Sequence, residues 1–383
     1  MIPLYNAGRF LRKSLQQPLY AARVLAKRAA AYFYYIYGSG KSSYPESLTL
    51  FLTYRCNLRC RMCGQWGRKG ITKKYDAQYV SSEIPADKMK LIIDDVVSFR
   101  PNITLFGGEP LLYPGCAELI KHIKSKNMHC LMITNGSLLE DCAKDIVESG
   151  LDELNVSLDG KAELHDSIRG LPGLFDSIMR GLKKARSLKR GAGEKPLVNL
   201  QCTITRDNYK RLDDMLDVAE EAGAASLTFH NLIFLNSKVI ERQKEFDSVL
   251  GCDSTSWEGF DFDPGIDPEI LYKIMGRILS TKKNFSVDFY PNFSKASLVN
   301  YYKDPEAADP RYSGRCVSPW IAAYIFPDGE VRPCLNSTYS YGSVLNSGFA
   351  GIWNDEKAVK FRSFLRKKRS FSVCARCTEI YRY

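Results

Sequence analysis

The sequence predicts an α/β protein in which parallel strands form a sheet or barrel, followed by a small cysteine-rich module. Two observations lead to this prediction. First, six short stretches rich in β-branched and aromatic residues alternate with amphipathic stretches of helical spacing. Second, two more short strands flank the turn at residues 327–329 near the C-terminus, and four of the 12 cysteines follow residue 311.

The strands and helices are expected in strict alternation along the chain. Crossover connections of this kind are right-handed and place parallel strands side by side. In such folds the chemistry lies in the loops at the carboxyl ends of the strands. The predicted strands are residues 47–54, 102–106, 130–134, 153–159, 198–204 and 226–232. The predicted helices are residues 87–98, 118–126, 141–149, 175–189 and 211–222.

The chain length and composition fit a globular protein with one large domain and an appendage. The 383 residues are 45% hydrophobic, which is enough for a substantial core. The longest apolar run, residues 29–37, is shorter than the roughly 20 residues that span a bilayer. No signal-peptide pattern is present. In so long a chain, clustered cysteines indicate reduced thiols that hold metal rather than a disulfide framework, so we expect a cytoplasmic protein.

The net charge of +11 is unevenly distributed. Residues 1–45 contain no Asp or Glu, and residues 362–369 form a second basic run. Such runs attract phosphates or anionic lipid, or they are solvated helix faces. We therefore expect residues 1–45 to be a basic, aromatic arm with a helix opened by Pro18. It either contacts the inner membrane face at the periphery or packs on the main domain. The basic residues of the arm are Arg9, Arg12, Lys13, Arg23, Lys27, Arg28 and Lys41.

A cysteine triplet directly follows the first predicted strand. Cys56, Cys60 and Cys63 are close enough to bind one face of an iron–sulfur cube. Three ligands leave one iron of a 4Fe-4S cluster open, as a catalytic metal site requires. A structural zinc ion needs four ligands, and no further Cys or His lies near the triplet in sequence. The positive charge of the loop is expected to favour thiolates, and it comes from Arg55, Arg59 and Arg61.

The spacing C-x3-C-x2-C after a first strand resembles the signature of the radical SAM superfamily. The resemblance implies a partial (β/α)6 TIM-like barrel over residues 46–310. It also implies a 4Fe-4S cluster held by the triplet, with S-adenosylmethionine (SAM) bound to the open iron. Reductive cleavage of SAM would give methionine and a 5'-deoxyadenosyl radical that removes hydrogen from a substrate. The residue before the third cysteine usually contacts the adenine and is aromatic in the family, and here it is Met62.

Further motifs follow in the order of the family, each after a predicted strand. The glycines of the GGEP segment allow close backbone approach to a ligand, and Glu109 would accept from the ammonium of the methionine moiety. Ser157 would reach the ribose or carboxylate, and Arg169 would pair with the carboxylate; ordinary loop structure is the alternative for both. No catalytic acid or base is assigned. The residues assigned to the cofactor are Met62, Gly107, Gly108, Glu109, Pro110, Thr134, Asn135, Ser157, Asp159 and Arg169.

A second set of cysteines lies in residues 311–383. Its spacing resembles a SPASM/twitch module, which implies one auxiliary 4Fe-4S cluster. Zinc is the alternative, because four thiolates suit it equally well. The set consists of Cys316, Cys334, Cys374 and Cys377. The other cysteines show no ligand spacing, and His230 either faces a substrate cavity or is a core histidine.

The resemblance implies an oxidoreductase-type enzyme that takes electrons from a reductant such as flavodoxin or ferredoxin. The basic arm and tail favour an anionic substrate such as a sugar nucleotide, a lipid-linked compound or another small metabolite. A peptide or protein substrate is the alternative within the family. A non-catalytic iron–sulfur or zinc-binding protein is the alternative from another class. No nucleic-acid partner is expected.

Overall fold

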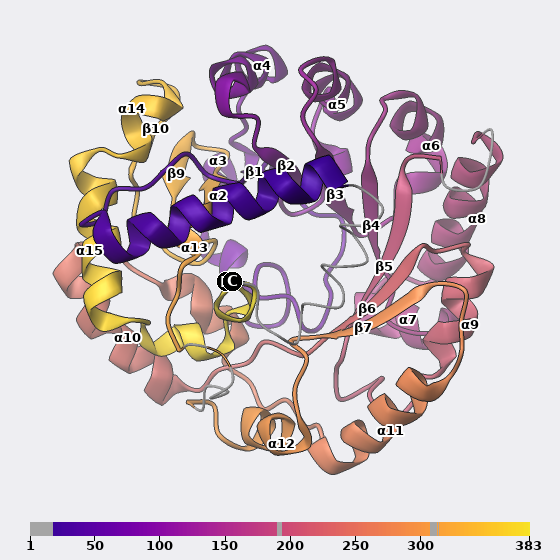
Figure 1. Cartoon of the computed structure of the whole chain (residues 1–383). Coiled ribbons are helices and arrows are strands. Elements are labelled where there is room, and N and C mark those ends of the chain that lie inside the picture. Colours follow the sequence, from indigo (N-terminus) through magenta and orange to yellow (C-terminus); the bar gives the residue numbers. More distant parts are fainter. Residues whose placement is uncertain (1–17, 190–193, 307–311, 313) are drawn as a thin grey trace.

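The structure is a computed structural model that describes residues 18–189, 194–306, 312 and 314–383. Within them, one ten-stranded sheet has the order β10-β9-β8-β1-β2-β3-β4-β5-β6-β7. The sheet curves around a central space, and most helices lie on its outside (Figure 1). This arrangement confirms the predicted partial α/β barrel.

All six predicted strands form, and they pair in parallel in chain order from β1 to β6. Leucine, isoleucine and valine alternate with polar residues along several of them, so one face packs under the helices while the other lines the ring. The strands are β1 (Ser47–Phe51), β2 (Asn102–Phe106), β3 (Cys130–Thr134), β4 (Glu153–Ser157), β5 (Leu197–Thr203) and β6 (Ser226–His230).

The predicted helices also form, and each turns an apolar stripe to the sheet. For example, α4 (Ala86–Asp95) buries Met89, Ile92 and Ile93. The other helices of the barrel are α5 (Cys116–Ser125), α6 (Leu139–Glu148), α7 (Ala162–Arg169), α8 (Leu174–Ser187), α9 (Asp214–Glu221), α10 (Ser237–Leu250), α11 (Pro268–Ser280) and α12 (Lys295–Lys303). Shorter or later helices are α3 (Ala77–Ser81), α13 (Ser318–Ile321), α14 (Phe349–Trp353) and α15 (Glu356–Lys368).

The sheet continues beyond the six predicted strands at both sides. β7 (Ser286–Tyr290) pairs in parallel with β6 and lies in a region whose sequence shows no regular pattern. The predicted hairpin near the C-terminus forms as β8 (Ala322–Ile325) and β9 (Glu330–Arg332), with β10 (Gly342–Ser343) beside it. Because β8 also pairs in parallel with β1, the cysteine-rich region shares the sheet of the barrel.

The last residues of the chain lie between β7 and β8. The hydroxyl of Tyr290 on β7 donates to the carbonyl oxygen of Thr378 at 2.7 Å. Burial raises the pKa of Tyr324 on β8, and the negative charge of nearby Glu379 raises this pKa further. The chain end lies near the middle of the ring in Figure 1, so this segment fills the seam that the sheet leaves open.

The helix opened by Pro18 packs on the barrel, which was one of the two predicted alternatives for the arm. In α2 (Pro18–Tyr37) the ammonium of Lys27 donates to the carbonyl oxygens of Phe99 at 2.6 Å and of Pro45 at 3.3 Å. Arg28 pairs with Glu46 at 2.7 Å. Arg9, Arg12 and Lys13 lie outside the described residues. None of the helices in the described part of the chain is long and apolar enough to cross a membrane.

Candidate active site

The cysteine triplet lies on a loop at the carboxyl end of β1. The loop is fixed by its own backbone and by α7, since Cys63 N donates to Cys60 O at 3.1 Å and Arg61 N donates to Ile168 O at 3.0 Å. Cys60 is buried, whereas Cys56 and Cys63 are half-buried. Met62 is half-buried between the last two cysteines.

Each of the three sulfur atoms accepts an N–H group from a different residue. Asn135 Nδ2 lies 3.8 Å from Cys56 Sγ, and Arg169 Nη1 lies 3.8 Å from Cys60 Sγ. The backbone N–H of Trp66 donates to Cys63 Sγ at 3.4 Å. Donors to sulfur stabilise its negative charge and tune an iron–sulfur cluster, so this donor set fits cluster-ligating thiolates.

The arginines of the loop do not supply the positive charge at the sulfur atoms. Arg55 pairs with Glu83 at 2.7 Å, and the Arg59 guanidinium stacks 4.2 Å from the centroid of the Trp66 ring. Arg61 reaches Ser167 and Asp207. The expectation that these three side chains favour thiolates is therefore not met, because each has another partner, and the cation beside Cys60 is Arg169.

Burial favours the protonated thiols of Cys56 and Cys60 in the absence of metal. It raises the pKa of Cys56 to about 11 and also raises the pKa of Cys60, which Arg169 counteracts. A bound metal deprotonates such a thiol outright. Within the described residues, no three His, Cys, Asp or Glu side chains stand close enough to share one metal ion. The ligands of a four-iron cluster instead bind separate iron atoms.

The GGEP segment packs directly on the cysteine loop. Gly108 N donates to Thr53 O at 2.7 Å, and Glu109 N donates to Arg55 O at 2.9 Å. A Cβ atom on Gly107 would lie 2.6 Å from Thr53 O, and one on Gly108 would lie 2.1 Å from Arg55 O. The glycines therefore allow the close approach of two protein backbones.

Replacing Gly108 with alanine is expected to lower the free energy of unfolding by about 1–3 kcal/mol, because the methyl group overlaps a backbone oxygen that cannot move freely. Gly276→Ala is the matched control, since a Cβ atom on Gly276 would meet no other atom within 4 Å and helix α11 favours alanine there. Urea unfolding measures both variants. Equal stability of the two would contradict the tight packing of this segment.

Glu109 is fully buried and held by its neighbours. Its carboxylate accepts from Thr134 Oγ1 at 2.6 Å, from Asn135 N at 2.7 Å and from Leu111 N at 3.1 Å. Burial raises its pKa, and the hydrogen bonds from Thr134 and Asn135 act in the opposite direction. Thr134 and Asn135 thus orient Glu109, while Pro110 begins a short 3-10 turn behind it. A carboxylate has about four acceptor positions, so capacity remains for a cationic ligand.

Arg169 and Asp159 form a buried ion pair beside the cysteine loop. Arg169 Nε donates to Asp159 Oδ2 at 2.6 Å, and Thr203 N donates to Asp159 Oδ1 at 2.8 Å. Arg169 was expected to pair with a cofactor carboxylate, and here its partners are Asp159 and Cys60. Ser157 is half-buried at the end of β4, in register with Gln201 on β5.

Polar side chains line the ring near Ser157. His230 Nε2 donates to Gln201 Oε1 at 2.5 Å, and its imidazole packs edge-on against Tyr290. The side chain of His230 is only half-buried. Two alternatives were predicted for His230, a core histidine and a histidine that faces a substrate cavity. The structure shows features of both, because His230 is hydrogen-bonded and lies on the inner face of the strands.

The four C-terminal cysteines come together from separate segments. Cys316 precedes α13 and Cys334 follows β9. Cys374 lies on the short 3-10 helix Ser372–Arg376, and Cys377 directly follows that helix. Burial raises the pKa of Cys316, and the neighbouring sulfur groups of Cys374, Cys334 and Cys377 raise this pKa further. Phe371 N donates to Cys374 Sγ at 3.4 Å. Cys252 also lies near Cys334, which the long sequence separation concealed.

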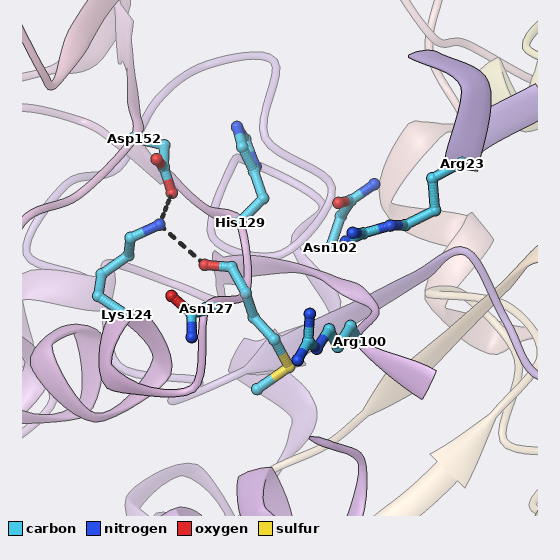
Figure 2. A pocket seen from close by; sticks show the side chains of 8 residues that line it. Arg23, Arg100, Asn102, Lys124, Asn127, His129 and Asp152 are labelled. Carbon is cyan, nitrogen blue, oxygen red and sulfur yellow. Dashed lines mark hydrogen bonds and ion pairs between the residues drawn. The ribbon is translucent and has the colours of Figure 1, made fainter. Parts of the chain in front are cut away.

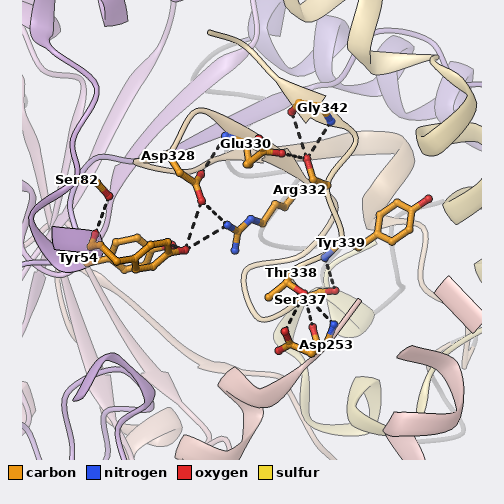
Figure 3. Close-up of polar contacts among 12 residues, drawn as sticks. Tyr54, Ser82, Asp253, Asp328, Glu330, Arg332, Ser337, Thr338, Tyr339 and Gly342 are labelled. Carbon is orange, nitrogen blue, oxygen red and sulfur yellow. Dashed lines mark hydrogen bonds and ion pairs between the residues drawn. The ribbon is translucent and has the colours of Figure 1, made fainter. Parts of the chain in front are cut away.

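A partly buried polar chain links the segments that precede Cys56 and Cys334, and Figure 3 shows Tyr54, Asp328 and Arg332 of this chain. The hydroxyls of Tyr54, two residues before Cys56, and Tyr79 are 3.0 Å apart, and Tyr79 donates to Asp328 at 3.4 Å. Arg332, two residues before Cys334, donates to Asp328 at 2.6 Å. The sequence alone did not reveal this link or the role of Trp66.

Comparisons with known proteins agree with this arrangement. The radical SAM superfamily model matches residues 50–228, and the iron–sulfur cluster-binding SPASM domain matches residues 316–378. The Fe-coproporphyrin III synthase of Methanosarcina barkeri is 31% identical over 211 residues, which are 52% of this chain and 49% of that protein. This chain therefore matches about half the length of that relative.

A second relative matches over nearly its whole length. The AdoMet-dependent heme synthase of Methanosarcina barkeri is 30% identical over 342 residues, or 87% of this chain and 88% of that protein. Among solved structures, Streptococcus suis SuiB bound to its precursor peptide SuiA has a TM-score of 0.60 at 15% identity, covering 96% of this chain and 76% of that chain. At this identity the likeness shows the fold alone. The chain belongs to the radical SAM superfamily and carries a C-terminal SPASM domain.

Proposed function

We propose that this radical SAM enzyme modifies a small anionic metabolite, with iron porphyrins as the first class to test. The family shows that the cofactors are a 4Fe-4S cluster and SAM, and that the SPASM domain carries auxiliary iron–sulfur chemistry. When bound, these groups supply a 5'-deoxyadenosyl radical. The observation that carries the proposal is the three-cysteine loop, whose sulfur atoms each accept an N–H group.

The chain's own residues have distinct roles in this proposal. Cys56, Cys60 and Cys63 would hold the SAM-binding cluster and leave one iron open. Glu109, fixed by Thr134 and Asn135, would accept from the ammonium of SAM. Arg169 would hold the charge on Cys60 while Asp159 fixes its orientation. Met62 and Ser157 would contact the adenosine. The module boundaries at residues 45 and 310 are likewise proposals.

The auxiliary site is proposed for Cys316, Cys334, Cys374 and Cys377. Their thiols lie near one another and are buried or half-buried, as a cluster excluded from water requires. One 4Fe-4S cluster, whose ligands bind separate irons, is the proposed occupant. Zinc is the alternative, and it would require these thiols to move together, because no three of them in the described part of the chain stand close enough to share one ion. The number of irons per protein distinguishes the two.

The names of the two relatives support the choice of substrate. Both refer to heme or a coproporphyrin, and one matches 87% of this chain. The net charge of +11 agrees with an anionic substrate. The proposal of a sugar nucleotide or a lipid-linked compound as substrate is supported by charge alone. A peptide substrate is the second candidate, supported by the likeness in fold to SuiB with its precursor peptide.

The reductant is proposed to be a flavodoxin or a ferredoxin. We also propose that the N-terminal region contacts a membrane at its surface.

The test is anaerobic reconstitution with iron and sulfide, followed by dithionite and SAM. We expect the wild-type protein to form 5'-deoxyadenosine. The Cys374→Ala variant should lose auxiliary iron and still cleave some SAM without substrate, because the SAM-binding cluster is separate. Addition of Fe-coproporphyrin III should then give a product only with the wild type. No 5'-deoxyadenosine from a protein of full iron content would refute the proposed function; no porphyrin product would refute the substrate alone.

A further inference from the structure

Helix α2 leaves one apolar face uncovered by the described part of the chain. Four large side chains on it are exposed: Leu25 by 44%, Phe33 by 59%, Ile36 by 46% and Tyr37 by 70%. Their spacing places them on one stripe of the helix, with the exposed alanines at positions 22, 26 and 29 between them. The helix contains no Asp or Glu. A continuous exposed patch of this kind marks an interaction surface.

A basic hollow adjoins the N-terminal half of this stripe. It has a volume of about 250 Å³ and lies between α2 and the amino ends of β2 and β3 (Figure 2). The one carboxylate among its lining residues, Asp152, is already paired with Lys124 and Lys195. The residues lining it are Arg23, Arg100, Asn102, Lys124, Asn127, Met128, His129 and Asp152.

A second basic hollow adjoins the other end of α2. It has a volume of about 320 Å³ and is lined by Ser363, Arg366 and Lys367 of α15. Ser363 Oγ donates to the carbonyl oxygen of Ser39, two residues after the end of α2, at 3.0 Å. The apolar stripe therefore lies between two groups of cations.

We propose that this face docks on an anionic lipid surface, with the stripe of α2 among the acyl chains and the two hollows at the headgroups. The inference deepens the membrane contact proposed above. Apolar side chains enter the interface, and each nearby Lys or Arg adds attraction to anionic lipid. A second copy of the chain would bring the same positive charge against itself. A nucleic acid would meet the cations but leave the aliphatic Leu25 and Ile36 of the stripe without an apolar partner.

The position of this face determines how a docked enzyme is oriented. Lys27 of α2 donates to the carbonyl oxygens of Pro45 and Phe99, which precede β1 and β2. The cysteine loop follows the opposite, carboxyl end of β1. A protein docked through α2 thus presents its proposed active site to the aqueous phase, so a water-soluble substrate fits this orientation and a lipid-linked one does not.

Vesicle flotation of the full-length, iron-loaded protein tests the docking face. The probes are vesicles of phosphatidylcholine with phosphatidylglycerol and vesicles of phosphatidylcholine alone. The double variant Phe33→Asp/Ile36→Asp is expected to bind the anionic vesicles at least about tenfold more weakly. The matched control is Val249→Asp/Leu279→Asp, which adds the same charge at positions exposed by 57% and 55% on α10 and α11. The control should bind as the wild type does.

The variant Arg366→Gln/Lys367→Gln separates the cationic contribution. We expect roughly thirtyfold weaker binding, and a loss of wild-type binding at high salt. Circular dichroism and iron content confirm that each variant is folded. Three results would overturn the proposal. The first is that the wild-type protein does not float with anionic vesicles, and the second is that Phe33→Asp/Ile36→Asp and the control Val249→Asp/Leu279→Asp lose vesicle binding equally. The third is that the wild-type protein is a dimer that Phe33→Asp/Ile36→Asp converts to a monomer. Formation of 5'-deoxyadenosine is measured separately, without vesicles. A failure of the proposed enzymatic function is thereby distinguished from a failure of membrane docking.

Discussion

The Cys60→Ala variant is expected to form no detectable 5'-deoxyadenosine from SAM and dithionite. Cys60 is one of only three cysteines on the loop, so its loss leaves two ligands for a four-iron cluster. It is also the sulfur that the Arg169 guanidinium approaches at 3.8 Å. Iron content should fall by about one cluster. Liquid chromatography with mass spectrometry of the nucleoside, beside an iron assay, measures both effects.

Cys130→Ala is the matched control for this experiment. Cys130 is also buried, but it lies on β3 and its thiol faces the core. Its replacement removes a similar volume and should leave both iron content and SAM cleavage near the wild-type values. Wild-type cleavage by the Cys60→Ala variant would refute the proposed ligand set. Equal losses from Cys60→Ala and Cys130→Ala would point to general unfolding instead.

The Asp159→Asn variant is expected to lose about 3–5 kcal/mol of unfolding free energy, because it leaves a buried guanidinium without its counter-charge. Asp159 is fully buried and Arg169 is 8% exposed, so water cannot replace the lost partner. Arg169 should also lose its orientation toward Cys60. We therefore expect SAM cleavage to fall about 10- to 100-fold, as it does when residues that support metal ligands are changed.

An exposed ion pair provides the comparison. Asp213 pairs with Arg277 at the surface, with the two side chains 35% and 61% exposed. Asp213→Asn should cost less than about 1 kcal/mol, since solvent screens such pairs. Urea unfolding under anaerobic conditions compares the two variants. If both variants lose the same small amount of unfolding free energy, burial does not strengthen the Asp159–Arg169 pair, contrary to our inference.

Much of the barrel could be predicted from the sequence. Short stretches rich in β-branched and aromatic residues indicate buried parallel strands, and apolar residues at helical spacing indicate the helices between them. β7 was not predicted, because SVDFY is short and carries Asp288 on the face toward the ring. The pairing of β8 with β1 also escaped prediction. Strands as far apart in sequence as those of Ser47 and Ala322 leave no local pattern that records their contact.

The site was predictable as a set of residues but less so as a set of contacts. The cysteine spacing located the loop. Its arginines were expected to favour the thiolates, and they contact Glu83, Asp207 and the Trp66 ring. The sequence also did not reveal that Gly107 and Gly108 lie against the backbone of Thr53 and Arg55. Side-chain direction depends on partners that are distant in sequence, and these become visible only in the folded chain.

The central claim is that one iron of the cluster held by Cys56, Cys60 and Cys63 remains open to SAM. Electron paramagnetic resonance of the dithionite-reduced Cys374→Ala variant tests it most directly, because the auxiliary signal is then removed. We expect the addition of SAM to change the spectrum of the remaining cluster. An unchanged spectrum from a protein whose iron and sulfide match one 4Fe-4S cluster would contradict it.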